Sequence, residues 1–393
     1  MDGFGFSCKN RKGMRILLWA PFGAGTHYWG PGTSAYRLYR SNKDQEVRVT
    51  LVHGSSRQGA FPTVYDEQIQ IGNLEKKGLF NVVLFLIKST FWILRHRKKY
   101  DVFHGLTAYF YTFIPALLFS SGNKKAFIKI TGVSGGFTNN GNLSKILGFS
   151  ALRKHQSNRM SGYFSVSSDI SKSLVEQGID RARVFYIPNG VDTDRFTPAD
   201  SGEKSALRKA NGIQDVFTIC YIGGLTSNKR ILPIVEATHD LIEQGLSLQF
   251  LIVGPDRENG IIETEISSYI SKHNLKDACI RIEHTTDPEL YFKVSDVFVL
   301  NSKFEGLSNS LLEAMSSGLP CVASPASGTT DLIENEKTGY LTDGSSSDIS
   351  KKISLLYSDQ DLYKRISINA RDKILNGFSV DFVWGQHIKL FEK

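Results

Sequence analysis

The chain has 393 residues, a formal net charge of +8 and 41% hydrophobic residues. Because single cores stop growing at about 250 to 300 residues, this length predicts two domains. The ordinary composition excludes collagen-like, mucin-like and wholly disordered chains. A basic chain suits phosphate-bearing small molecules first and an anionic membrane surface second. Nucleic acid is disfavoured, because the basic residues are scattered and show neither a zinc-ligand pattern nor regularly interleaved aromatics.

The N-terminus and the cysteines indicate the compartment. The first thirteen residues lack the apolar core of a secretory signal, so a cytoplasmic location is expected. The four cysteines are Cys8, Cys220, Cys279 and Cys321. The last three lie in apolar runs typical of buried strands. Buried thiols therefore fit better than disulfides or metal ligands, which agrees with a reducing compartment.

In the first half of the chain, short β-rich apolar runs alternate with segments of helical period, the pattern of parallel sheets covered on both faces. The expected strands are Met14–Ala20, Val47–Val52, Asp101–His104, Ala126–Ile130, Tyr163–Val166 and Val184–Ile187. Helices fall between them. One is Ser168–Gly178, in which Ser168 is the expected cap and Gly178 ends the helix.

The most apolar stretch of the chain is Leu79–Leu94. It contains Lys88 and is short, whereas a membrane-spanning helix needs about 20 largely uncharged residues. The basic run Arg95–Lys99 follows at once. A core helix with a solvated basic end is favoured over a helix that lies on anionic lipid, and both interpretations stay open.

The second half starts a new series of strands, expected at Phe217–Ile222, Leu248–Val253, Cys279–Glu283, Asp296–Asn301 and Cys321–Ala323. Pro233 suits the first turn of a helix between the first two. Because Pro, Gly, Asp and Ser cluster between Pro188 and Asn211, we expect domains at 1–200 and 201–377, with the boundary near Asp200. The final segment, 378–393, has a helical pattern.

The segment Asn301–Pro320 combines a loop and a helix in a way that suits ligand binding. It leaves a strand, turns through Gly306, begins a helix with Ser308 as the expected N-cap, and ends at Gly318. In open parallel sheets, ligands bind beyond the carboxyl ends of the strands, which is where this loop lies.

Two carboxylates stand out in this segment. Glu305 lies at the amide end of the helix, where peptide N–H groups favour phosphate, so a carboxylate there suits sugar hydroxyls better. Helical spacing separates Glu313 from its apolar neighbours, so it can face a cleft. The alternative is that Glu305 is an ordinary helix-start charge and Glu313 a solvated side chain.

These residues carry a resemblance. Glu305 and Glu313, within Ser302–Leu307 and Leu311–Pro320, look like the paired-glutamate motif of retaining family 4 glycosyltransferases. Ile187–Phe196 resembles the interdomain signature of that family, and further matching stretches are Leu251–Gly254 and Gly328–Gly339. The resemblance implies an α/β protein of the GT-B fold, with two Rossmann-like doubly wound parallel-sheet domains facing a cleft. The first would hold the acceptor and the second the donor, and the segment after Phe378 would cross back to the first.

The resemblance also implies roles for single residues. Glu305 would hold the donor sugar, Glu313 the ribose hydroxyls, and Lys229 the diphosphate. The backbone at Gly306 and Leu307, with the adjacent Ser308, would lie close to the transferred sugar and the phosphate. For Lys229 the alternative is a solvated loop lysine.

The glycines before this lysine show a departure from the family. Gly223 and Gly224 match its strand-loop-lysine element, but the family often has an arginine where this chain has Gly224. Either Arg230 substitutes for it, or the contact with the diphosphate is weaker, or another basic residue helps.

The first half resembles the family less closely. Gly32, in the loop Trp29–Thr33, best matches a glycine loop of the family, with an ordinary strand-helix turn as the alternative. His104 resembles the strand that ends at the active site and is a candidate catalytic residue, or else a structural histidine. A second histidine that the family often carries is Leu106 here. The loop Thr131–Gly136 is a candidate for the acceptor side.

No metal ion and no separate cofactor are predicted. Asp192 and Asp194 have the spacing of a metal-bound sugar-nucleotide site, but their place in the interdomain signature favours hydrogen bonds to nearby backbone. The nucleotide-diphosphate sugar would be the substrate, so Lys229 and helix amides would neutralise its leaving diphosphate.

The function implied by the resemblance is that of a retaining, hexosyltransferase-type glycosyltransferase. It would move a sugar from a nucleotide-diphosphate donor to a glycan or lipid-linked acceptor in bacterial surface polysaccharide synthesis. The expected location is the cytoplasm, with peripheral contact to the anionic inner face of the plasma membrane and no nucleic-acid partner. Two alternatives stay open: a sugar-nucleotide epimerase or phosphorylase on the same fold, and a non-catalytic sugar-nucleotide-binding subunit.

Overall fold

The computed structural model describes residues 13–25, 30–42, 46–55, 64–75, 78–121, 124–132 and 156–393. The chain forms two compact units, one of Met1–Pro188 with Val383–Lys393 and the other of Asn189–Phe382. The boundary expected near Asp200 therefore lies inside the second unit. The physical reason is that the linker already bonds within that unit, because the Val191 N–H donates to the Phe378 carbonyl at 2.9 Å.

The first unit contains a seven-stranded parallel sheet with the order β3-β2-β1-β4-β5-β6-β7. Its strands are β1 Arg15–Trp19, β2 Arg48–His53, β3 Glu67–Gln70, β4 Val102–Leu106, β5 Lys125–Ile130, β6 Gly162–Ser165 and β7 Val184–Tyr186. Its helices are α1 Gly30–Arg40, α2 Leu79–His96, α3 Phe110–Ser120, α6 Ser168–Glu176 and α15 Val380–Glu392, with short 3-10 turns η1 Arg97–Lys99, η2 Ser157–Arg159 and η3 Arg181–Arg183. The six expected strands are confirmed. The edge strand β3 was not predicted, because its side chains are polar and largely exposed.

The second unit contains a six-stranded parallel sheet with the order β10-β9-β8-β11-β12-β13. Its strands are β8 Phe217–Ile222, β9 Leu248–Val253, β10 Cys279–Ile282, β11 Val297–Leu300, β12 Cys321–Ala323 and β13 Tyr340–Leu341. Its helices are α7 Ser201–Ala210, α8 Leu232–Glu243, α9 Ile261–Lys272, α10 Pro288–Lys293, α11 Asn309–Ser316, α12 Thr329–Leu332, α13 Ser346–Ser358 and α14 Gln360–Gly377, with the turn η4 Ser227–Lys229. The five expected strands are confirmed, whereas β13 is too short to show a pattern.

The terminal helix α15 belongs to the core of the first unit. Its residues Val383, Ile388 and Phe391 are buried in one cluster with residues of β1, β2 and β4. In addition, the Lys125 ammonium donates to the Phe391 carbonyl at 2.9 Å. Chain segments from the two ends of the sequence therefore share one hydrophobic core.

The N-terminal caps of two helices were predicted from the sequence, one correctly and the other one residue away from its position in the structure. Ser308 caps α11 as predicted, since its hydroxyl accepts from the Leu311 N–H at 3.3 Å. Helix α6 is capped by Ser167 and not by Ser168, because Ser167 has the extended backbone that a cap needs and accepts from Ile170. Pro233 lies in the first turn of α8, as expected.

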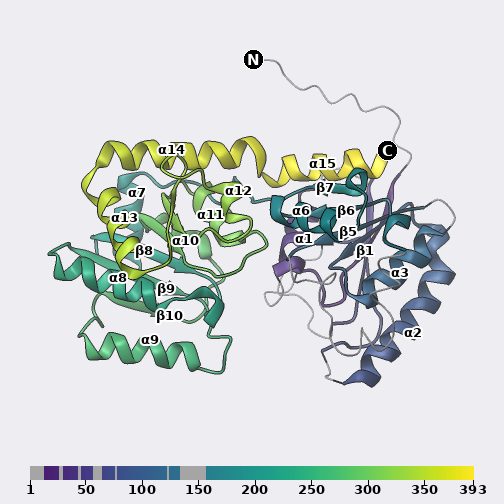
Figure 1. The fold of residues 1–393 in the computed structure, drawn as a ribbon, viewed down its shortest axis with the longest axis horizontal. Helices are drawn as coiled ribbons and strands as arrows, with labels where there is room; N and C mark the ends of the chain where they lie inside the picture. Colours follow the sequence, from purple (N-terminus) through teal and green to yellow (C-terminus); the bar gives the residue numbers. More distant parts are fainter. Residues whose placement is uncertain are drawn as a thin grey trace, which may run out of the picture. The chain divides into compact units, whose positions relative to one another are not determined.

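Helix α2 is covered on one face only. Phe85, Ser89 and Ile93 are buried, whereas Phe80 and Phe91 are 75% and 72% exposed. Figure 1 shows α2 on the outside of the first unit, alongside α3. By length and apolar composition, the segment Leu79–Lys99 could also cross a membrane. The core-helix interpretation thus holds for one face of α2, and the opposite face needs another explanation.

Candidate functional site

The candidate site lies at the carboxyl edge of the second sheet. Strand β8 pairs in parallel with both β9 and β11, so the loops that follow these three strands leave the sheet on the same side. The β8 loop carries Lys229, and the β11 loop carries Glu305 and leads into α11. This edge is where open parallel sheets bind their ligands.

Lys229 and Glu305 form an ion pair across these two loops. Their side chains are 21% and 13% exposed. The neighbouring Asn228 fixes the pair, because its side-chain amide donates to the Phe304 carbonyl at 2.9 Å and its side-chain oxygen accepts from the Phe304 N–H at 3.0 Å. Lys229 is therefore not a solvated loop lysine, and Glu305 is a largely buried carboxylate with a cationic partner.

The loop before α11 is packed from one side by a glycine. A Cβ atom at Gly328 would lie 2.1 Å from the Gly306 carbonyl oxygen, and Gly328 has a φ of +75°. Only glycine permits both this backbone approach and this backbone angle. The start of α12 therefore packs directly on the predicted donor loop.

The same loop is held from the other side by Asn189, a residue of the Ile187–Phe196 signature. Its side-chain amide donates to the Leu307 carbonyl at 3.3 Å and to the Asn309 side chain at 3.1 Å. Leu307 itself is buried. Sequence reasoning did not select Asn189 as a site residue, although its place in the signature was the available signal.

Glu313 is only 4% exposed, so the alternative of a solvated side chain is wrong. Burial lowers the pKa of the nearby Arg195. The carboxylates of Glu289 and Glu313 act in the opposite direction, and the pKa of Arg195 is raised overall. Arg195 donates to Glu289 at 2.6 Å. Arg195 is thus a second residue of the signature that lies near a predicted site residue.

The β8 loop approaches the β9 loop through glycines. A Cβ atom at Gly254 would lie 2.0 Å from the Gly223 carbonyl oxygen. A Cβ atom at Gly224 would lie 2.9 Å from Cγ and 3.2 Å from Nε of Arg257. Sequence reasoning did not select Arg257, because nothing in the local pattern relates it to Gly224.

Arg230 does not fill the place beside Gly224. Its Nε donates to the Asn301 carbonyl and its Nη2 to the Asn301 side-chain oxygen, both at 2.9 Å. A Cβ atom at Gly344 would lie within 2.7 Å of the Arg230 guanidinium. The Arg230 guanidinium thus ties the end of β11 to the neighbouring loop.

His104 is fully buried inside β4, in the core of the first unit. Its Nδ1 lies 2.7 Å from the Tyr39 hydroxyl, and its ring lies 5.4 Å from that of His387 on α15. Burial, together with His387 and Lys129, holds the pKa of His104 well below its usual range. A catalytic residue must reach the reacting atoms, so the structure corrects the assignment of His104 to the catalytic set.

The other candidates of the first half are only partly described. Gly32 is buried in the first turn of α1, so Gly30 to Thr33 are helical and do not form the expected loop. Trp29 and residues 133–136 of the second candidate loop lie outside the described residues. Leu106 is buried at the end of β4.

Asp192 hydrogen-bonds to nearby backbone, as predicted. Its carboxylate accepts from the Asp194 and Arg195 N–H groups at 3.2 and 3.0 Å. The expectation of buried thiols is confirmed for Cys220, Cys279 and Cys321, and Cys8 lies outside the described residues.

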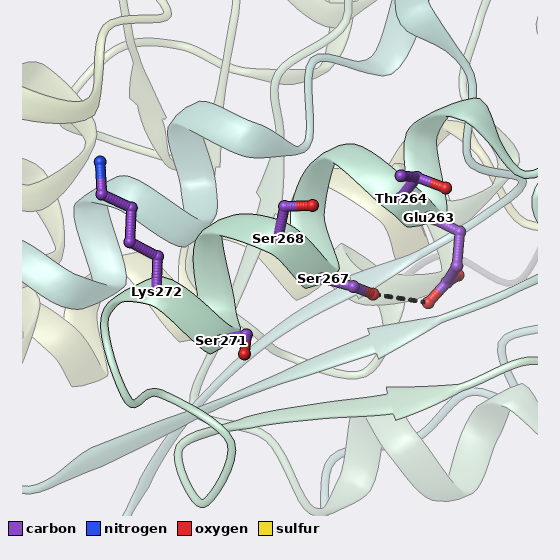
Figure 2. Close-up of a pocket in the computed structure, with 6 residues that line it drawn as sticks. All are labelled: Glu263, Thr264, Ser267, Ser268, Ser271 and Lys272. Atoms are coloured by element: carbon purple, nitrogen blue, oxygen red, sulfur yellow. Dashed lines mark hydrogen bonds between the residues drawn. The ribbon is translucent and has the colours of Figure 1, made fainter.

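A separate pocket lies on α9 and contains none of the predicted site residues. Figure 2 shows that its lining comes from one helix, and the residues are Glu263, Thr264, Ser267, Ser268, Ser271 and Lys272. A surface formed by a single helix cannot enclose a sugar nucleotide, which needs groups from several sides. The loop edge of the second sheet remains the better candidate.

Two family models match the chain. Glycosyl transferases group 1 matches residues 203–373, and Glycosyltransferase Family 4 matches residues 29–195. The chain is 34% identical over 214 residues to the UDP-Gal:alpha-D-GlcNAc-diphosphoundecaprenol alpha-1,3-galactosyltransferase of Escherichia coli, an alignment that covers 53% of each protein. It is 25% identical over 217 residues to the capsular polysaccharide biosynthesis glycosyltransferase CapM of Staphylococcus aureus, covering 55% of this chain and 56% of CapM. The chain thus spans about half the length of the curated relatives it matches.

Solved structures resemble the fold over nearly the whole chain. A glycosyltransferase from Rickettsia africae has a TM-score of 0.80 at 18% identity, covering 97% of this chain and 98% of that one. The Anabaena protein HepE, in complex with UDP and glucose, has a TM-score of 0.78 at 18% identity, covering 97% and 100%. The predicted GT-B fold, with two parallel-sheet α/β domains, is confirmed. The two family models, one for each half of the chain, support a group 1 glycosyltransferase family.

Proposed function

We propose that this protein is a retaining, hexosyltransferase-type glycosyltransferase that moves a sugar from a nucleotide-diphosphate donor to a glycan or lipid-linked acceptor. The observation that carries the proposal is the Lys229–Glu305 ion pair at the loop edge of the second sheet. It brings a cation suited to a diphosphate next to a carboxylate suited to sugar hydroxyls.

The relatives support the choice of substrates. By its name, the Escherichia coli relative uses UDP-galactose and an acceptor linked to diphosphoundecaprenol, and CapM belongs to capsular polysaccharide biosynthesis. The structurally similar HepE binds UDP and glucose. We therefore place the proposed reaction in the synthesis of bacterial surface polysaccharide.

In the proposed complex, Glu305 accepts hydrogen bonds from the donor sugar, and Glu313 accepts them from the ribose. The peptide N–H groups at Gly306 and Leu307, which precede the capped start of α11, face the phosphate. Gly223 and Gly224 let the β8 backbone approach the donor closely. Burial of Glu313 favours this role, because a buried carboxylate gains strongly from two hydroxyl donors.

The proposed reaction needs no nucleophile from the protein. The acceptor hydroxyl oxygen bonds to the anomeric carbon on the face from which the diphosphate departs, so the configuration is retained. As the carbon–oxygen bond to the diphosphate breaks, the leaving phosphate oxygen takes the proton of the acceptor hydroxyl. Lys229 and the amide end of α11 stabilise the negative charge that develops. These groups perform the neutralisation without a metal ion, so EDTA should leave the rate unchanged.

The exposed face of α2 supports the peripheral membrane contact, which is part of the proposal. At 100° per residue, its large exposed apolar side chains fall within an arc of about 120°; they are Leu79, Phe80, Val83, Ile87, Phe91 and Leu94. Exposed basic residues border this arc or follow it, namely Lys88, Arg95, Lys98 and Lys99. An apolar stripe beside cations fits the anionic surface of a bilayer. Co-sedimentation with anionic and with neutral lipid vesicles tests this contact.

The test of the catalytic proposal begins with a thermal-shift panel of nucleotide sugars, because a bound donor raises the unfolding temperature. The donor that binds is then offered with lipid-linked and glycan acceptors. Glu305→Ala should lower the transfer rate by a factor of about 100 or more, the loss typical of a removed active-site hydrogen bond. Transfer by Glu305→Ala at the wild-type rate would contradict the assignment.

Two controls separate the alternatives. Glu305→Gln keeps the shape of the side chain, so an equal unfolding temperature for this variant and a low transfer rate show that the charge itself matters. Inorganic phosphate as the acceptor would identify a phosphorylase, and an epimerised nucleotide sugar without transfer would identify an epimerase. Binding of a nucleotide sugar without any reaction would indicate a non-catalytic subunit.

A further inference from the structure

Arg281, on β10, hydrogen-bonds to three carbonyl groups at the carboxyl edge of the second sheet. Its Nη1 donates to the carbonyls of Ile252 and Ile282 at 3.0 and 2.6 Å, and its Nη2 donates to the Gly254 carbonyl at 2.5 Å. Its Nε donates to the Glu263 carboxylate at 2.6 Å, and the Arg281 side chain is 17% exposed. One guanidinium thus joins the ends of β9 and β10 to α9.

The Gly254 backbone that Arg281 holds packs against the candidate donor loop. The Gly254 N–H donates to the Ile282 carbonyl at 2.8 Å, so the N–H and the carbonyl of Gly254 are both fixed. A Cβ atom at Gly254 would lie 2.0 Å from the Gly223 carbonyl oxygen, at the start of the loop that carries Lys229. A change at Arg281 is therefore transmitted to this loop through the Gly254 backbone.

Tyr221, on β8, is a second link between Arg281 and the same loop. Both residues pair with Ile252 of β9 in parallel register, so their side chains lie on the same face of the sheet. The buried Tyr221 hydroxyl donates to the Gly224 carbonyl at 2.9 Å. Burial raises the pKa of Tyr221, the negative charge of Glu305 raises it further, and the positive charge of Arg281 opposes this. The Tyr221 hydroxyl is therefore close to both charges.

Uncovered carbonyl groups at this edge would oppose the binding of a diphosphate. At the carboxyl end of a sheet, the last carbonyls lose their partners on the neighbouring strand, and their partial negative charges lie where ligands bind. A diphosphate is repelled by such oxygens. Arg281 covers three of them, and the Gly223 N–H covers a fourth, that of Val253, at 2.9 Å. The guanidinium thus makes this edge less negative.

An ion pair with Glu263 does not by itself account for this arrangement. A guanidinium has five N–H groups, and one of them serves Glu263. The three bonds to carbonyls use the remaining fork of Arg281, and each ends on the strands that flank the donor loop. The backbone at the sheet edge is therefore the main partner of Arg281.

We propose that Arg281 is a positioning residue of the donor site, which fixes the β9 loop against the β8 loop and shields the diphosphate from the carbonyl groups at the ends of β9 and β10. It acts through Gly254, through Tyr221 and through its charge. This inference rests on the proposed function, because it assumes that a nucleoside diphosphate binds at this edge.

The experiment is calorimetric titration of the full chain with UDP, GDP and ADP, followed by titration of variants with whichever diphosphate binds. Arg281→Met uncovers the three carbonyls and leaves the Glu263 charge without its partner. Binding should therefore weaken about tenfold, the order expected for one charge about 10 Å away. Arg281→Lys keeps the charge but loses the paired donors, so its loss should be smaller.

Glu263→Gln separates a positioning role from a purely structural one. It removes the negative charge but keeps an oxygen that can accept from Arg281. Both Glu263→Gln and Arg281→Met should lower the unfolding temperature. A purely structural ion pair predicts weaker diphosphate binding in both variants. A positioning role predicts that Glu263→Gln binds the diphosphate at least as tightly as the wild type, because Arg281 still covers the carbonyls and its charge is no longer cancelled.

The matched control is Arg208→Met. The Arg208 side chain is 7% exposed and bonds to the Val294 carbonyl at 2.9 Å and to the carboxylates of Asp215 and Asp296 at 2.9 and 2.6 Å. Asp215 precedes β8 and Asp296 precedes β11, so this arginine lies at the amino edge of the same sheet. Its loss should lower the unfolding temperature without changing the diphosphate affinity of the folded protein.

The outcomes distinguish the inference from the proposed function. If the wild-type chain binds none of the three diphosphates, the proposed function fails and the inference fails with it. If the wild type binds one of them and Arg281→Met binds it equally well, Arg281 is not a positioning residue, while the proposed function stands. Equal weakening by Glu263→Gln or by Arg208→Met overturns it in the same way. If Arg281→Met does not fold, the comparison of Arg281→Lys with Glu263→Gln decides.

Discussion

The two units of the protein stabilise their buried polar groups in different ways. The first unit buries His104, His387 and Lys129 in an aromatic core, and burial lowers the pKa of His387 to about 3 and that of Lys129 to about 8. The second unit pairs its charges, as where Asp296 accepts from Arg208 at 2.6 Å and Lys204 at 2.7 Å. A buried base whose pKa is lowered by folding makes the free energy of unfolding depend on pH. A buried ion pair instead makes it depend on whether both charged side chains are present.

This difference bears on function. In the second unit, charged side chains connect loops, and the candidate donor site is one such connection between the β8 and β11 loops. In the first unit, polar groups are sealed in the core, and the exposed feature is the apolar face of α2. The second unit thus joins its loops through charged side chains, whereas the first unit exposes an apolar helix face.

The largest effect is expected from breaking the ion pair in the second unit. Asp296→Ala removes the partner of Arg208 and Lys204 and an acceptor of the Thr218 N–H, which donates at 2.7 Å. Loss of one partner of a buried pair costs about 3 to 5 kcal/mol of the free energy of unfolding. Urea unfolding followed by hydrogen exchange of amides in the second unit measures it.

The matched control for this variant is Asp215→Ala. Asp215 contacts the same Arg208 at 2.9 Å, but its side chain is 63% exposed. Asp215→Ala should lower the free energy of unfolding much less than Asp296→Ala, because solvent replaces the contact with Arg208. Equal losses for the two aspartates would show that burial of the ion pair does not distinguish the second unit.

The next effect concerns the membrane surface of the first unit. The double variant Phe80→Ser with Phe91→Ser should weaken binding to anionic vesicles about 100-fold, as each ring gains about 1.5 kcal/mol or more on burial. Binding should also decrease with salt, because the basic residues beside the stripe interact through charge. Co-sedimentation at several salt concentrations checks both expectations.

The control is Ile368→Ser, which changes an apolar side chain that is 61% exposed in the second unit. Since this residue lies outside the α2 stripe, vesicle binding should not change. Two results would contradict a membrane surface confined to the first unit. One is an equal loss of vesicle binding in Ile368→Ser and the α2 variant, and the other is unchanged binding in the α2 variant. Self-association through the α2 face would appear as a concentration-dependent mass that the α2 variant abolishes.

The smallest effect is the pH dependence of the first unit. The folded-state pKa of His387, about 3, lies below the unfolded value of about 6.5. Between these values the unfolded state binds more protons, so stability is full above about pH 6.5 and decreases as the pH falls. At pH 5 this histidine should cost the first unit about 2 kcal/mol.

Hydrogen exchange of first-unit amides at pH 7 and pH 5 measures this loss. His387→Phe should reduce the difference between the two pH values, even though it also removes the 2.9 Å bond from Nδ1 to the Val383 carbonyl at both. The exposed His284 of the second unit provides the control, and His284→Phe should leave the difference unchanged. An unchanged pH difference in His387→Phe would refute the role of its burial.

Much of the candidate site follows from local sequence. The loop after β11, the Ser308 cap and the place of Lys229 after β8 could all be predicted, because strand ends, turns and caps depend on neighbouring residues. The pairing of Lys229 with Glu305 could not be predicted, since it depends on the parallel pairing of β8 with β11. Arg257 was missed for the same reason, because its relation to Gly224 exists only between two loops.

The sequence by itself determined the alternation of strands and helices, and with it two parallel sheets whose loops gather at one edge, because the periods of strand and helix are local properties. Tertiary structure alone decided which face of α2 is covered and that α15 closes the core around His104. It also decided that the Arg257 stem crosses Gly224. These features arise from packing between segments far apart in the chain. Local sequence patterns do not predict which distant side chain packs against a given residue.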